Sequence, residues 1–125
     1  MIQLDFDHWP DKALFPNMAG NQLHWAQRAK SRKVARQEAY CMALNKKPEK
    51  PFERATIEIQ ITAKDYRRHD GDSFAYAVKA WVDGMVDAGI LEDDNYFCVP
   101  EITIRFGGVS TEAVSIIVKE LGCIK

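Results

Sequence analysis

The chain has 125 residues, of which 46% are hydrophobic and 28% charged, and its formal net charge is −1. This length predicts a single domain over residues 1–125, with a core of ordinary size. No apolar run approaches the roughly 20 residues that a membrane span requires, and residues 1–7 lack the basic and apolar regions of a secretory signal. The three cysteines are widely spaced and form no C-x-x-C pair, so the sequence supports neither a zinc knuckle nor a disulfide framework and favours a cytoplasmic location.

The first half of the chain alternates between strand and helix patterns. Residues 1–7 predict a short strand, and the segment 8–24, which is rich in Pro, Gly and Asn, predicts a long loop. Apolar residues at helical spacing predict a helix over 25–45, which Pro48 prevents from continuing. Strict alternation of isoleucine with polar residues predicts a strand over 55–63.

The second half continues the alternation. Apolar residues at spacings of three and four predict a helix over 73–88, and Gly89 is a natural residue to end it. Strands are predicted over 98–106 and 113–120, joined by a turn at Gly107–Gly108 into an antiparallel hairpin. The resulting fold class is α/β (α+β), a small mixed sheet with two main helices packed on it.

Charge is distributed unevenly along the chain. Residues 21–54 carry nine Lys or Arg against three Glu, whereas residues 70–101 carry eight acids against Lys79 alone. Such asymmetry is expected when one segment binds phosphates and another holds a metal ion. It is also expected of two solvated faces that pair with each other, and charge alone does not separate these interpretations.

The acidic half contains a constellation typical of a metal site. Asp70 and Asp72 flank Gly71, and a second acidic cluster, 92–94, follows the predicted helix. Carboxylate oxygens suit Mg²⁺ or Mn²⁺, which often act on phosphate groups. The two acidic groups can meet only if the chain doubles back after Gly89. The alternative is structural: a turn dipeptide, a helix cap and a solvated loop.

Two further features bear on this interpretation. An EF-hand starting at Asp70 is excluded, since its sixth residue is Ala75 rather than Gly and its twelfth is Trp81 rather than Glu. Lys79 is the only base of the acidic half, and it lies four residues before Asp83 on the predicted helix. It could stabilise charge at a phosphate or simply form a surface ion pair.

Two runs of the sequence resemble a known family. Residues 67–73 (RRHDGDS) and 79–94 (KAWVDGMVDAGILEDD) resemble the signature of the RusA family of Holliday junction resolvases, which is R-x-D-x-D-N, then K-x-x-x-D with A-G, then D-D. Residues 21–25 (NQLHW), followed by a basic stretch, are similar to the family's N-terminal loop and basic helix. Two positions depart from the pattern: Ser73 replaces asparagine, and three extra residues precede the lysine.

The resemblance implies a RusA-like fold and a set of catalytic residues. Asp70, Asp72 and Asp94 would hold Mg²⁺, for which Mn²⁺ could substitute, and Lys79 would complete the site. Asp93 matches the first acid of the D-D pair, and the sequence does not decide whether it also binds metal. The three extra residues leave open whether Lys79 keeps its place beside the aspartates.

The activity implied by the resemblance is metal-dependent cleavage of branched DNA. A homodimer would bind a four-way junction and cut it by paired, symmetric nicks during recombination and repair, in the cytoplasm of a bacterial or phage-infected cell. Two alternatives stay open: a branched-DNA-binding protein without catalysis, and a less specific nuclease that cuts flaps or forks. The residues expected to contact DNA are basic: Arg28, Lys30, Arg32, Lys33, Arg36, Arg67 and Arg68.

Overall fold

The computed structural model describes residues 1–16, 25–66 and 71–122, apart from the side chain of Asp72. Helices and strands alternate along these residues as the sequence predicts, in a mixed α+β fold. Their order is β1 (Ile2–Phe6), the 3-10 helix η1 (Lys12–Leu14), α1 (Trp25–Leu44), β2 (Ala55–Ala63), α2 (Gly71–Ala77), α3 (Lys79–Ala88), β3 (Glu101–Val109) and β4 (Ala113–Glu120). Within these residues, no helix is both long and apolar enough to cross a membrane.

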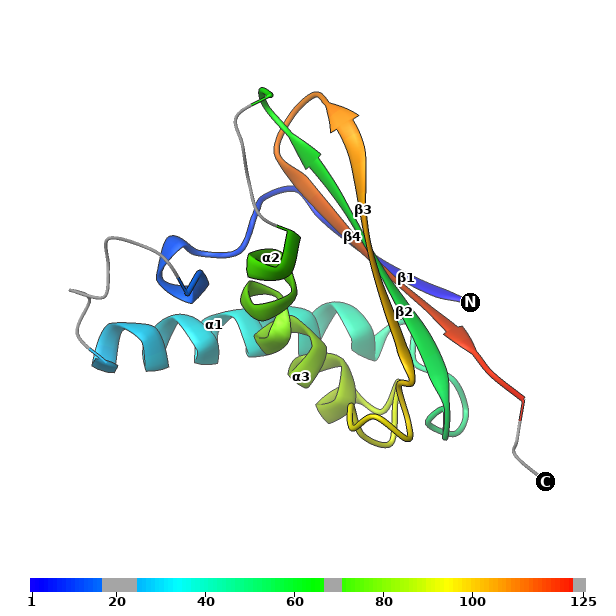
Figure 1. The fold of residues 1–125 in the computed structure, drawn as a ribbon. Helices are drawn as coiled ribbons and strands as arrows, with labels where there is room; N and C mark the ends of the chain where they lie inside the picture. Colours follow the sequence, from blue (N-terminus) through cyan, green and yellow to red (C-terminus); the bar gives the residue numbers. More distant parts are fainter. Residues whose placement is uncertain (17–24, 67–70, 123–125) are drawn as a thin grey trace.

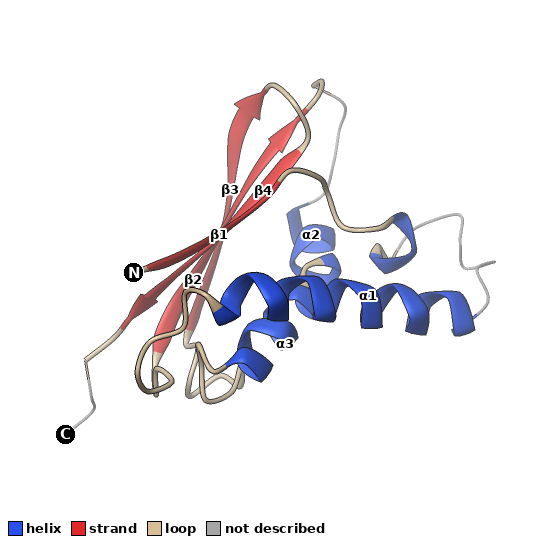
Figure 2. Ribbon diagram, turned by 180° about the vertical axis from the view of Figure 1, so that it is seen from behind, coloured by secondary structure: helices blue, strands red, loops and turns tan. Residues whose placement is uncertain are grey.

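The strands form one mixed sheet in the order β1-β4-β2-β3. Strand β3 pairs parallel to β2, and the two other pairings are antiparallel. The helices all lie on one side of this sheet (Figure 1), and the view from behind shows the same two layers (Figure 2). Ile57, Ile59 and Ile61 of β2 face the helices and are buried, so the alternation seen in the sequence marks the core face.

The predicted hairpin between the last two strands is wrong. Strands β3 and β4 follow each other along the chain, but β2 lies between them in the sheet. Gly107 and Gly108 belong to β3 rather than to a turn, and Gly108 has a φ of 117° at an irregularity in the pairing with β2. Alternation identifies a strand but not its neighbours, and a bulge uses glycine for the same reason that a turn does.

Helix α1 has its fully buried side chains in its C-terminal half, while Arg28 in the first half is half-buried beside η1. Ala35, Ala39 and Ala43 are buried, whereas Trp25 and Val34 are 74% and 61% exposed. These two larger apolar residues follow the helical spacing that predicts α1, but they do not belong to its packed face. Small side chains allow α1 and α3 to approach closely, and the first half of α1 extends past the sheet and α3 (Figure 1).

The second predicted helix is divided in two. Helix α2 ends at Ala77 and α3 begins at Lys79, with Val78 between them at φ −83° and ψ −4°. Hydrogen bonds still run from the Val78 amide to the Phe74 carbonyl and from the Val82 amide to the Val78 carbonyl, so the break is a local bend. The division places Lys79 at the start of a helix rather than in the middle of one.

A buried tryptophan connects three elements through ring stacking and a hydrogen bond. The Trp81 ring of α3 stacks on Phe6 of β1, with the ring centroids 3.8 Å apart. Its Nε1 donates to Oε1 of Glu38 on α1 at 3.1 Å, and the other Glu38 oxygen lies 2.7 Å from Nε2 of His8. The His8 Nδ1 lies 2.8 Å from the Trp9 carbonyl. Both ring nitrogens of His8 therefore face acceptors, which suits the protonated imidazolium.

This network predicts a pH-dependent stability. Burial by itself would lower the pKa of His8, but the hydrogen bonds to Glu38 and to the Trp9 carbonyl, with the charges of Glu38 and Asp7, raise it above its ordinary value of 6.5. A raised pKa contributes stability below pH 6.5, and this contribution is lost as the pH rises through the folded-state pKa. Urea unfolding at pH 5.5 and pH 8.5 should show a larger loss of stability in the wild type than in His8→Gln. Equal losses would contradict the proposed role of His8.

Candidate active site

The chain reverses direction directly after α3. Gly89 has a φ of 96°, and its amide donates to carbonyls in the last turn of the helix, which ends there as the sequence predicts. The next two residues, Ile90 and Leu91, are buried, and the Ile90 carbonyl accepts a hydrogen bond from the Phe52 amide. The chain thus doubles back, as an encounter between the two acidic groups requires.

The loop that carries Asp94 is held by its own side chains. Asp93 Oδ1 accepts a hydrogen bond from the Asp94 amide at 2.7 Å. Asn95 Oδ1 accepts from the amides of Phe97 and Cys98, at 3.0 Å each. The loop is joined to the start of β2 where the Ala55 amide donates to the Cys98 carbonyl. These contacts fix the backbone at Asp94, as a preorganised site requires.

Lys79 brings together two acids that are distant in sequence. Its Nζ donates to Asp83 Oδ1 at 2.6 Å and to Asp94 Oδ2 at 2.5 Å. The hydrogen bond from the Lys79 ammonium lowers the pKa of Asp94 below its ordinary value and so stabilises the ionised carboxylate. Burial by itself would lower the pKa of Lys79, but its hydrogen bonds to the two acids raise it overall. The surface pair with Asp83 therefore forms, but it is only part of the contact.

Lys79 and Asp94 lie at the opening of a hollow between the helices and the sheet. This hollow has a volume of about 110 Å³. Apart from these two residues its lining is apolar: Ile57, Ile59, Ala75, Val78, Val82, Val99 and Ile102. Apolar surroundings reduce the screening of charges at the opening. The pair is thus partly shielded from water but accessible from outside.

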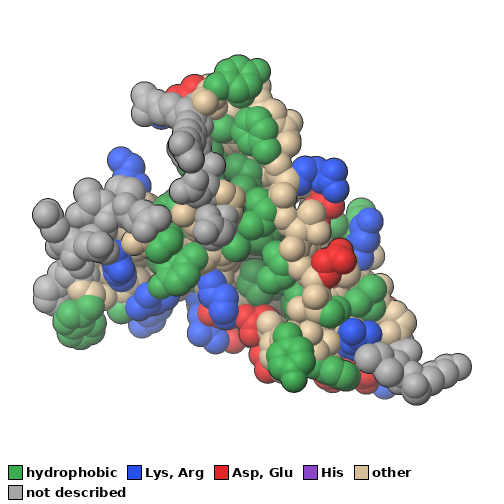
Figure 3. Space-filling model, in the orientation of Figure 1, with side chains coloured by type: hydrophobic (Ala, Val, Ile, Leu, Met, Phe, Trp, Pro, Cys, Tyr) green, Lys and Arg blue, Asp and Glu red, His purple; other side chains and the backbone are tan. Residues whose placement is uncertain are grey.

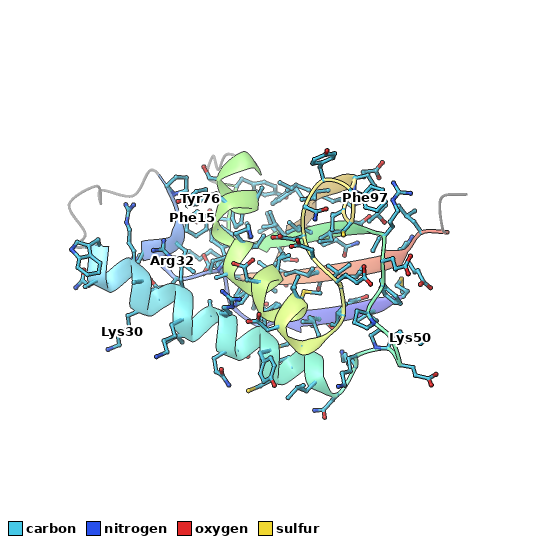
Figure 4. All side chains as sticks on the ribbon, turned by 90° about the horizontal axis from the view of Figure 1, so that it is seen from below. Phe15, Lys30, Arg32, Lys50, Tyr76 and Phe97 are labelled. Carbon is cyan, nitrogen blue, oxygen red and sulfur yellow. The ribbon has the colours of Figure 1, made fainter. Side chains whose placement is uncertain are left out.

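A second hollow, of about 130 Å³, lies on the other side of Lys79. Arg28 and Arg32 of α1 line it together with Lys79 and Tyr76, so three cations share one depression. Side chains in Figure 4 place Arg32 on the side of α1 nearest to Tyr76 and Phe15, whereas Lys30 points away from the body. Among the predicted DNA contacts, Arg28 and Arg32 are the residues that lie beside the candidate site.

The other predicted basic residues differ in position. Arg36 forms a bidentate ion pair with Asp87 of α3, with its Nη2 donating to Asp87 Oδ1 at 2.8 Å. Its guanidinium therefore joins the two helices, and a DNA phosphate that contacted Arg36 would compete with Asp87 for it. Lys33 is exposed on α1. Arg67 and Arg68 lie outside the described residues.

The structure describes the predicted metal ligands only in part. Asp72 is the second residue of α2, but its side chain, like the whole of Asp70, lies outside the described residues. Within the described part of the chain, no three His, Cys, Asp or Glu side chains form a group that could hold a metal ion. The ionised Asp94 carboxylate, at the opening of a hollow, fits one ligand of a hard cation such as Mg²⁺.

Two residues of this region were not among the sequence candidates for the site. Asp83 was expected only as a surface partner of Lys79, although the K-x-x-x-D spacing indicated that the two share a helix face. No sequence pattern pointed to Tyr76, because an exposed tyrosine at the border of the apolar face of a helix is common and indicates no particular function. Its place beside Arg28 follows from the crossing of the helices and not from a local pattern.

Comparison with known proteins does not assign the chain to a family. A scan against models of protein families gives no match, and a search of curated proteins gives none either.

Proposed function

We propose that the protein is a metal-dependent endonuclease that acts on branched DNA, as its resemblance to the RusA family implies. The contact between Lys79 and Asp94 carries the proposal, since it joins two elements of the motif that are 15 residues apart. The two hollows beside Lys79 add support, because one is rich in arginine and the other opens at an acid. A phosphate bound between the two hollows would lie close to the three cations of the second hollow and to the Asp94 carboxylate.

The proposed chemistry divides the work among a few side chains. Asp94, with Asp70 and Asp72, would hold Mg²⁺. When bound, Mg²⁺ supplies a nucleophilic water at neutral pH and offsets charge on the phosphate. Lys79 orients the Asp94 carboxylate and offers its remaining N–H to a phosphate oxygen, where negative charge grows in the transition state. Arg28 and Arg32 position the DNA backbone without reading its sequence.

A cleavage assay on synthetic DNA tests the proposal. The protein is incubated with a four-way junction, a fork, a flap and a linear duplex, each with Mg²⁺ or with EDTA. Paired nicks at symmetric positions of the junction, seen only with Mg²⁺, are the expected result. Junction binding without nicks would favour a branch-binding protein instead. Cleavage of the fork and flap at the rate of the junction would favour the less specific nuclease.

The arginines of the second hollow predict that the affinity for DNA falls as the salt concentration rises. If Arg32 contacts one phosphate, Arg32→Ala should reduce the slope of log K against log salt concentration by ~0.9 and weaken binding to every sequence alike. Lys119→Ala is the matched control, since Lys119 lies opposite Thr56 on the face of the sheet away from the helices. Titrations at four salt concentrations measure the slopes. The same slope in all three proteins would exclude the assigned contact.

A further inference from the structure

Strand β3 presents an unprotected edge of the sheet. It is the last strand in the order β1-β4-β2-β3, and among the described residues only β2 pairs with it. The opposite edge strand, β1, has five residues with the acid Asp5 exposed near its end, whereas β3 has nine residues. Unpaired N–H and C=O groups along a long edge are a template for another strand.

Apolar side chains continue this edge onto the helix-facing side. Ile102 and Phe106 are opposite the buried Ile57 and Ile61 of β2, so they face the same way, yet they are 54% and 56% exposed. Figure 3 shows hydrophobic side chains gathered along the part of the surface where β3 runs. A strip of this kind beside an open edge is typical of a protein interface rather than of a DNA contact.

We propose that a second copy of this chain pairs antiparallel with β3 about a two-fold axis at Thr103. The strand is complementary to itself in this register: Glu101 lies opposite the partner's Arg105, and Ile102 opposite the partner's Ile104. Each of these pairs occurs twice because of the symmetry. Arg105 also lies 3.4 Å from Glu58 of its own chain, so in the pairing it would be shared between Glu58 and the partner's Glu101. The opposite charges at equal distances from Thr103 favour a copy of the chain over an unrelated strand, which would have to carry the same order by chance.

The pairing has a geometric consequence for the candidate site. A two-fold axis between antiparallel edge strands is perpendicular to the sheet, so both helical layers lie on the same side of the combined sheet. Both copies of Lys79 and Asp94 then face one substrate. This consequence rests on the proposed function, which requires two cuts in one junction, whereas the pairing itself can be tested without DNA or metal.

A cysteine cross-link tests the register. In a background with Cys41→Ser and Cys123→Ser, Thr103→Cys places two thiols at the axis, where the Cα atoms of paired residues are ~4.5–5.5 Å apart, within disulfide range. Mild oxidation should convert most of the protein to covalent dimers. Gln3→Cys, on the opposite edge strand β1, is the matched control and should give few dimers. Equal cross-linking of both variants would refute the register.

Charge reversal gives an independent measurement of the same interface. Glu101→Arg alone sets like charges opposite each other twice and should raise the dimer Kd by ~10-fold. Adding Arg105→Glu, which also removes the ion pair of Arg105 with Glu58, should recover most of this loss. The double variant of Ile102→Lys and Phe106→Lys should raise it by ~100-fold or more. Sedimentation measures Kd, and circular dichroism confirms that each variant is folded. A wild-type monomer at 50 µM, or a dimer that none of these changes weakens, would overturn the proposal.

Discussion

Replacement of Asp94 by asparagine is expected to abolish cleavage of a four-way junction while leaving junction binding unchanged or tighter. Asparagine keeps the shape of the side chain but removes the charge that a metal ion needs, which should lower kcat by ~10²-fold or more. Binding should not weaken, because one negative charge near the phosphates is lost. Asp70→Asn and Asp72→Asn are expected to behave in the same way. Single-turnover cleavage in Mg²⁺ and a binding titration in Ca²⁺ measure the two effects.

Glu92→Gln is the matched control for this prediction. Glu92 is an exposed acid at the start of the same loop, so its replacement removes an equal charge two residues from Asp94. It should retain nearly the full rate. If Glu92→Gln were as inactive as Asp94→Asn, the loss would reflect the charge of the loop and not a ligand. If Asp94→Asn cut at the wild-type rate, Asp94 would have no part in catalysis.

A single methyl group added at Gly84 is expected to destabilise the protein strongly. Helix α3 crosses α1 at this glycine, and a Cβ added here would lie 2.2 Å from the Arg36 carbonyl oxygen and 3.0 Å from the Ala39 Cβ. The nearest obstacle is backbone, so one helix must shift and break the packing of the crossing. Gly84→Ala should therefore cost ~3 kcal/mol or more, at or beyond the upper end for overpacked cores. Urea denaturation of the purified variant measures the loss.

Gly107→Ala shows what the same substitution does where space exists. A Cβ at Gly107 would meet the Ile61 carbonyl oxygen at 3.4 Å, an ordinary contact. Its effect on the free energy of unfolding should stay below ~1 kcal/mol. Similar values for the two alanine variants would mean that the helix crossing relaxes easily. The site should then also tolerate larger residues at Gly84.

The sequence predicts the elements of this fold better than their pairing. The alternation over 55–63 matches β2 residue for residue, because a strand with one buried face has apolar residues at every second position. The position of β2 between β3 and β4 produces no local sequence pattern, since it depends on which neighbouring strands bury the most surface. Gly108 illustrates the limit: glycine marks an unusual backbone but does not distinguish a bulge from a turn.

The candidate site was also predictable from the sequence only in part. Lys79 and Asp94 were proposed from a motif, and they meet because Gly89 reverses the chain, which a glycine after a helix predicts. The approach of Arg28 and Arg32 to Lys79 was not predictable. It requires the angle at which α1 crosses α3, and that angle follows from alanine and glycine side chains too small to produce a strong pattern.

The N-terminal half of α1 extends past the sheet and α3, and it carries Arg28 and Arg32. Its first ten residues precede Ala35, the first fully buried residue of the helix, so this part of α1 is ~15 Å long. The helix is held where it touches α3 at Gly84 and where Arg36 pairs with Asp87. A DNA duplex that contacts this part of α1 would therefore bind a helix whose position is set by α3, and Lys79 is the first residue of α3.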